Sequence, residues 1–108
     1  MIKKILEKAG VLGLREKRVV SNEYCELVFY SKDTDAWREV LTEFLGPAAK
    51  PAGQKPTEKD IELTKSYGGV FGNQTLFKKA IRGKTVIAMF WPWQDKTHVT
   101  LKIAFIKK

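Results

Sequence analysis

Residues 84–105 read KTVIAMFWPWQDKTHVTLKIAF, and this stretch decides the fold. A two-residue turn at Asp95-Lys96 would fold it into an antiparallel hairpin whose first strand is apolar on both faces. Apolar side chains on both faces are typical of a central strand that is covered twice. The second strand alternates more cleanly, so we expect one of its faces to be exposed. The predicted cross-strand pairs are Ile87 with Ala104, Met89 with Lys102, Trp91 with Thr100 and Trp93 with His98.

The segment before the hairpin, residues 75–82, has two interpretations. Its apolar side chains fit two turns of helix, and they also fit a strand that turns at Arg82-Gly83 into the hairpin. We favour the strand because short isolated helices are only marginally stable in water.

A further strand is predicted at residues 24–30, YCELVFY, because β-branched and aromatic side chains dominate this segment. Ser21-Asn22 is a turn signal directly before it. If a tight turn forms there, residues 15–20 pair with this strand and Lys17 lies opposite Glu26 as a favourable charge pair.

Three segments predict helices. The longest has a broad apolar face and a charged opposite face, with Asp33 as candidate N-cap and Gly46-Pro47 as its end. A later helix starts at the capping-box pattern of Thr57 and Asp60 and ends before Gly68-Gly69. The residues predicted to pack are Ile2, Ile5, Leu6 and Ala9 in a short first helix, Ala36, Trp37, Val40, Leu41, Phe44 and Leu45 in the longest, and Ile61 and Leu63 in the last.

The order of these segments predicts the fold class. Residues 46–57 are rich in proline and glycine and form a loop, and the 108 residues as a whole suit one domain, residues 1–108. Helices followed by antiparallel strands are typical of an α+β fold. We therefore expect a mostly antiparallel sheet with two or three helices packed on one face.

Composition excludes several classes of protein. The chain is 44% hydrophobic and 30% charged, as in ordinary globular proteins, and it has no apolar run long enough to span a membrane. A single cysteine and a single histidine exclude a disulfide framework and a zinc site built from these residue types alone. We expect a cytoplasmic protein without metal or cofactor, in which Cys25 is a small core residue.

Basic residues are concentrated in one part of the chain. Residues 1–62 contain 11 basic and 11 acidic side chains, whereas residues 63–108 contain nine basic ones and a single acidic one, Asp95. The whole net charge of +8 therefore belongs to the predicted sheet region. A positive field of this kind attracts anions, and nucleic acid is the commonest large polyanion in a cell.

Aromatic side chains accompany these basic residues, and bases stack on aromatic rings. We expect a non-enzymatic binding module whose basic sheet region contacts nucleic acid or another polyanion. The same lysines would also serve to keep an edge strand from aggregating. The candidate residues for the anionic partner are Trp91, Trp93, His98, Lys102, Lys78, Lys79 and Arg82.

Two alternatives use other chemistry. In the first, the apolar strand face with Ile87, Met89 and Trp91 is the interface of a homodimer or of a complex with another protein. In the second, the protein binds a small molecule or is an enzyme, with His98 beside Asp95 as an acid–base pair. That alternative requires a pocket lined by His98 and a tyrosine.

Overall fold

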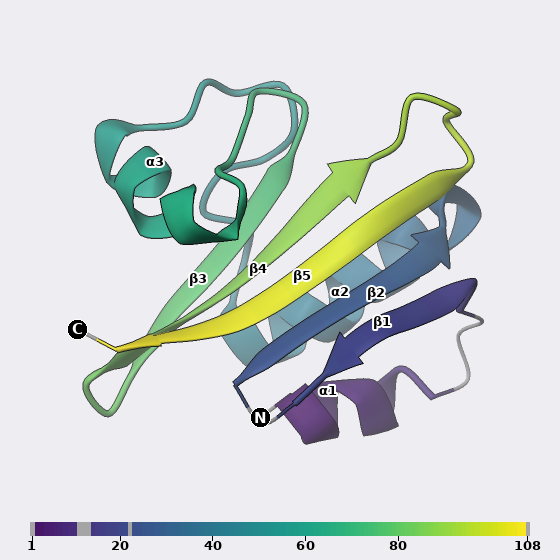
Figure 1. Ribbon diagram of the computed structural model, residues 1–108, viewed down its shortest axis with the longest axis horizontal. Helices are drawn as coiled ribbons and strands as arrows, with labels where there is room; N and C mark the ends of the chain where they lie inside the picture. The colour runs from purple at the N-terminus through teal and green to yellow at the C-terminus, as the bar shows by residue number, and fades with distance from the viewer. Residues whose placement is uncertain (1, 11–13, 22, 108) are drawn as a thin grey trace.

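One antiparallel sheet of five strands organises the part of the chain that the structure describes, in the order β1-β2-β5-β4-β3. The computed structural model describes residues 2–10, 14–21 and 23–107. Three α-helices accompany the sheet, and the predicted α+β fold is confirmed (Figure 1). The elements are α1 (Ile2–Lys8), β1 (Glu16–Val20), β2 (Tyr24–Tyr30), the 3-10 turn η1 (Ser31–Asp33), α2 (Thr34–Leu45), α3 (Glu58–Thr64), the 3-10 turn η2 (Lys65–Tyr67), β3 (Thr75–Ile81), β4 (Lys84–Pro92) and β5 (His98–Lys107).

The β4–β5 hairpin has the predicted register. Ile87 pairs with Ala104 and Trp91 with Thr100, and the Trp93 amide donates to the His98 carbonyl at 2.9 Å. The expectation of an exposed face on β5 is wrong. β5 lies at the centre of the sheet, between β2 and β4, and both of its faces are largely covered.

β3 confirms the strand interpretation of residues 75–82. It pairs with β4 through a two-residue turn in which Arg82 and Gly83 have φ values of 46° and 79°. Glycine adopts this left-handed conformation without steric cost. The proline-rich loop before α3 lies along the outer edge of β3, where Lys50 forms a β-bridge with Leu76.

The predicted pairing of Lys17 with Glu26 is wrong. Lys17 pairs with Leu27, and Glu26 pairs with Val19, because a β-bulge shifts the register of β1 between Lys17 and Val19. Such a bulge adds one unpaired residue to a strand and bends it. As a result Arg18, and not Lys17, forms the ion pair with Glu26.

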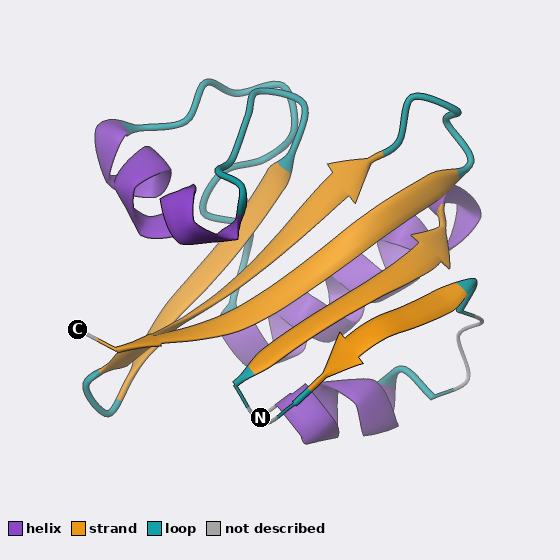
Figure 2. Ribbon diagram, viewed as in Figure 1, coloured by secondary structure: helices purple, strands orange, loops and turns teal. Residues whose placement is uncertain are grey.

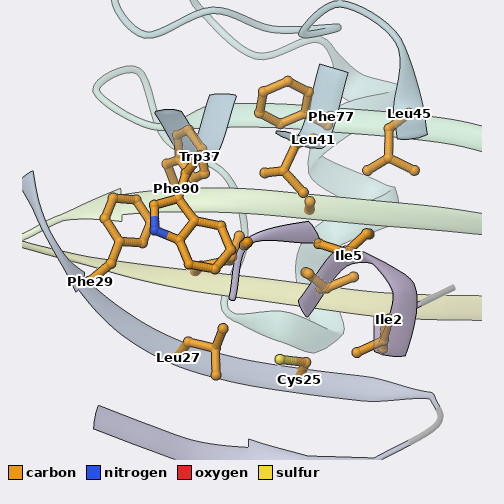
Figure 3. Packing of buried hydrophobic residues seen from close by; sticks show 14 of the residues in the cluster. Ile2, Ile5, Cys25, Leu27, Phe29, Trp37, Leu41, Leu45, Phe77 and Phe90 are labelled. Carbon is orange, nitrogen blue, oxygen red and sulfur yellow. The ribbon is translucent and has the colours of Figure 1, made fainter. Parts of the chain in front are cut away.

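The larger core lies between the sheet and the helices α1 and α2 (Figure 2). Trp37 of α2 stacks on Phe29 of β2, with ring centroids 5.3 Å apart, and Phe29 meets Phe90 of β4 edge to face (Figure 3). Asp33 is the N-cap residue of α2 as predicted, although its side chain makes no capping hydrogen bond. Cys25 is fully buried in this core, as expected.

A second, smaller core lies on the opposite face of the sheet, under α3 and η2. The predicted capping box of Thr57 and Asp60 is present at the start of α3. Leu63 packs as predicted, but Ile61 is 50% exposed, because it lies on the outer side of this short helix. Two helices thus cover one face of the sheet, and the third covers part of the other.

The described elements form one globule with a radius of gyration of 12.8 Å. Compact chains of this length are expected at about 13 Å. Among the helices of the described residues, none has the length and apolar character needed to cross a membrane.

Candidate nucleic-acid interface

The α3 face of the sheet is only partly covered. α3 and η2 pack over the β3 and β4 side, whereas β1 and β2 lie at the other edge (Figure 1). On this uncovered part, aromatic and basic side chains follow one another from the β4–β5 loop to β1. We call them the aromatic–basic row: Trp93, His98, Tyr30, Lys32, Arg15 and Arg18.

Trp93 is the centre of this row. Its indole Nε1 donates to Thr100 Oγ1 at 2.8 Å, which holds the ring against β5. The guanidinium carbons of Arg15 and Arg18 lie 5.5 and 5.7 Å from the centre of the same ring. Both distances fall within the range of cation–π contacts, so two positive charges flank one aromatic ring.

Two further rings extend the row beyond Trp93. The His98 ring centre lies 4.8 Å from that of Trp93 and 5.4 Å from that of Tyr30. Lys32 places its ammonium nitrogen 5.9 Å from the Tyr30 ring centre. His98 and Tyr30 meet because they are directly opposite each other in the β2–β5 ladder.

Asp95 sets the position of His98. Its carboxylate accepts the amide hydrogens of Thr97 and His98, and one oxygen lies 2.6 Å from His98 Nδ1. The hydrogen bond from the Thr97 amide, followed by that of the His98 ring, lowers the pKa of Asp95. The carboxylate therefore stays ionised and orients the imidazole beside Trp93.

Carboxylates also hold the two arginines. Glu16 contacts both Arg15 and Arg18, at 3.1 and 3.2 Å, and Glu26 contacts Arg18 at 3.3 Å. The hydrogen bond that Arg18 donates to Glu26 raises the pKa of Arg18. These guanidinium groups are partly exposed, and exposed ion pairs contribute only about 0–1 kcal/mol. A phosphate group can therefore compete for them.

Trp91 and Lys102 also meet, but in a different environment. Lys102 Nζ lies 3.7 Å from the centre of the Trp91 ring and donates to the Tyr67 carbonyl at 3.2 Å. Trp91 packs against the second core, and a Cβ atom at Gly68 would lie 2.4 Å from its ring. Trp91 is therefore held under η2 and is not free to stack on a base.

The remaining basic residues of the prediction lie apart from the row. Lys78 points to the α3 face and pairs with Asp60 at 3.1 Å. Lys79 points to the opposite face, toward the Phe44 carbonyl, and Arg82 is in the turn at the far end of β4. Neighbours in a strand point to opposite faces, so a run of lysines in the sequence does not make one patch.

Sequence reasoning missed Arg15, Arg18, Tyr30 and Lys32. They belong to the half of the chain whose formal charge is zero, so the charge count directed attention away from them. Only the pairing of β2 with both β1 and β5 brings them beside Trp93 and His98. The turn signal before β2 indicates its pairing with β1, which the structure confirms, but no feature of the sequence indicates its pairing with β5.

The predicted homodimer face is used inside the chain. Ile87 and Met89 are fully buried in the second core, because α3 and η2 cover them, and they are not available to a partner. The exposed edge of the sheet is β1, where the bulge and the charges of Lys17 and Arg18 oppose pairing with another strand.

Metal chemistry has no geometric support in the part of the chain that the structure describes. Within residues 2–10, 14–21 and 23–107, no three histidine, cysteine or acidic side chains gather into a group that could hold a metal ion.

Comparisons of the chain with models of protein families, with curated proteins and with solved structures find no match in any of the three.

Proposed function

We propose that this protein binds single-stranded nucleic acid along the aromatic–basic row. The observation that carries the proposal is Trp93, an indole on a sheet surface with the guanidinium groups of Arg15 and Arg18 within 6 Å of its centre. Aromatic rings contribute about 1–3 kcal/mol for each base that stacks on them. Guanidinium groups beside such a ring can bind the phosphates on either side of the stacked base.

Single strands fit this surface better than duplexes. The row offers ring faces on a sheet, and it has neither a helix that would enter a groove nor a protruding loop of basic residues. Base pairing hides the faces of the bases inside a duplex, whereas a single strand can present them. The net charge of +8 adds a long-range attraction for any strand.

The test is a tryptophan-fluorescence titration with mixed-sequence single-stranded DNA and RNA of about 16 nucleotides. It is performed at low and at moderate salt with the wild-type chain and with the double variant Arg15→Gln/Arg18→Gln. We expect saturable binding that weakens with salt. Log K falls as log salt rises, and each lost phosphate contact makes this fall less steep by about 0.7. The double variant should therefore show a slope whose magnitude is smaller by about 1.4.

The matched control removes two charges elsewhere. Lys3 and Lys4 are exposed on α1, on the opposite face of the sheet, and Lys3→Gln/Lys4→Gln changes the net charge by the same amount. This control should bind nearly as tightly as the wild type. Absence of saturable binding at low salt, or an equal loss in both double variants, would overturn the proposal.

A further inference from the structure

A pocket of about 270 Å³ opens on the α2 side of the β4–β5 loop, and it shares only Trp93 and His98 with the aromatic–basic row. Its walls come from the start of α2, the proline-rich loop, β3 and both strands of the hairpin. Its lining residues include Thr75, Phe90, Val99, Arg38, Lys96 and Ala52.

We propose that this pocket binds a small organic acid with an apolar body, such as an aryl-acetate or a branched aliphatic carboxylate. The floor of the pocket is apolar, with Phe90 and Val99 almost completely buried. Apolar floors of this kind accept rings or branched chains, and a few polar groups then fix the orientation of the ligand.

One polar group on the floor has no partner within the protein. Thr75 is 4% exposed and is directly opposite Phe90 in the β3–β4 ladder, so its side chain points to the pocket side of the sheet. Of the side-chain hydrogen bonds between described residues, none involves the Thr75 hydroxyl, and this oxygen is not among the fully buried atoms without a partner. The hydroxyl is therefore open to the pocket and can donate to, or accept from, a ligand there.

The rim of the pocket is basic. Arg38 and Lys96 line it, and the described lining residues include no acidic side chain. Arg38 pairs with Asp35 at 2.5 Å, but the Asp35 side chain is 94% exposed and lies outside the pocket. Because such a pair is weak in water, a carboxylate that enters the pocket can take over the guanidinium group.

The wall that carries Lys96 is held in place. The Ser31 amide donates to the Thr97 carbonyl at 2.8 Å, and the Ser31 hydroxyl donates to the Lys96 carbonyl at 2.9 Å. These two bonds join the β4–β5 loop to η1 at the start of α2. A wall ordered before binding reduces the entropy lost when a ligand is bound.

The chemistry of the floor selects an apolar body over a nucleobase. A base has several donors and acceptors on its edges, whereas the pocket sets few hydroxyls beside the apolar Phe90 and Val99, and two of them, on Ser31 and Thr34, already donate to backbone carbonyls. Burying the other polar atoms of a base without partners is unfavourable. This inference is independent of the proposed nucleic-acid binding, although Trp93 and His98 border both sites.

The test is a ¹⁵N–¹H NMR titration of the full chain with phenylacetate, repeated with the uncharged phenylacetamide. Phenylacetate should give saturable shifts at the amides of Arg38, Thr75 and Val99. Phenylacetamide and the variant Arg38→Gln should each bind at least tenfold more weakly. Ala52→Phe, a change at an exposed loop position on the rim, should abolish binding while leaving the other resonances in place.

The outcomes separate this inference from the nucleic-acid proposal. Arg15→Gln/Arg18→Gln should bind phenylacetate as the wild type does, and Ala52→Phe should bind oligonucleotides as the wild type does. Shifts that do not saturate, equal binding of acid and amide, or full binding by Ala52→Phe would each overturn the pocket proposal.

Discussion

Lys102 holds its ammonium nitrogen 3.7 Å from the centre of the Trp91 ring and donates from the same nitrogen to the Tyr67 carbonyl. One side chain thus joins the central strand β5, the indole of β4 and the turn η2. This contact explains why two tryptophans separated by one residue differ in role. Trp91 packs inside the molecule under η2, and Trp93 lies at the end of the hairpin beside two arginines.

Gly68→Ala tests the packing of η2 on Trp91. Gly68 has φ +95°, and a Cβ atom there would lie 2.4 Å from the indole, so strain and overlap both act against alanine. Gly69→Ala is the matched control, since Gly69 has φ +80° and nothing within 4 Å. Urea denaturation should show a loss of about 1–2 kcal/mol for Gly69→Ala and a further 1–3 kcal/mol for Gly68→Ala. Equal losses would show that the indole moves aside.

Glu26→Gln tests the acid dependence of stability. The Tyr24 hydroxyl, which donates to Glu26 at 2.8 Å, is the main cause that lowers the pKa of Glu26 below 4.5, followed by the hydrogen bond from Arg18. A carboxyl whose pKa is lower in the folded state stabilises the fold above its ordinary pKa, and this contribution is lost as pH falls through the folded value. The wild type should therefore lose more stability than Glu26→Gln between about pH 6 and pH 3.

The control for that experiment is Glu39→Gln, which removes an exposed carboxylate from α2. Its unfolding free energy should follow the wild type across the same pH range. Tyr24→Phe removes the hydrogen bond that the Tyr24 hydroxyl donates to Glu26. Like Glu26→Gln, it should make the unfolding free energy less dependent on pH. Parallel pH profiles of the wild type and Glu26→Gln would contradict the role given to this carboxylate.

Lys50→Met tests how the proline-rich loop is attached. Lys50 is buried, and its ammonium group donates to the carbonyls of Pro51, Gly72 and Gln74. Methionine would keep the length of the side chain but remove all three hydrogen bonds, which should cost about 1–3 kcal/mol in chemical denaturation, although the Pro51 and Gly72 carbonyls keep the amides of Gln54 and Gly53 as donors. Lys55→Met, at an exposed position of the same loop, should change stability by about 0.5 kcal/mol or less.

Cys25 should resist thiol reagents in the native protein. Its side chain is fully buried, and burial raises the pKa of the thiol to about 11. The reactive thiolate is therefore rare at pH values near 8, and a reagent can reach it only after the strand opens. Reaction with Ellman's reagent should be slow in buffer and rapid in denaturant. Rapid reaction in buffer would show that β2 opens readily.

Much of the fold could be predicted because its signals are local. The register of β4 and β5 follows from a turn centred on Asp95-Lys96 between a strand that is apolar on both faces and a strand whose apolar and polar side chains alternate. The capping box of Thr57 and Asp60 follows from spacing alone. The pairing of Lys17 could not be predicted, because a β-bulge arises only when two strands pair. The amino-acid composition of either strand alone does not indicate it.

The candidate site could be predicted only in part. Trp93 and His98 meet because they belong to one hairpin, and the sequence places them together. Arg15 and Arg18 lie beside them only because β5 pairs with β2 as well as with β4, and β2 in turn pairs with β1. The pocket at Thr75 likewise needs β3, α2 and the hairpin loop to meet.

By itself, the sequence determined which segments become strands and helices and how neighbours in the chain pair, because hydrophobic periodicity and turn residues act over a few positions. Only the tertiary structure decided which charges share a surface. Lys78 and Lys79 are adjacent in sequence and lie on opposite faces, whereas Arg18 and Trp93 are distant in sequence and lie together. The physical reason is that side chains alternate across a sheet and that strand order, not chain order, sets the neighbours within it.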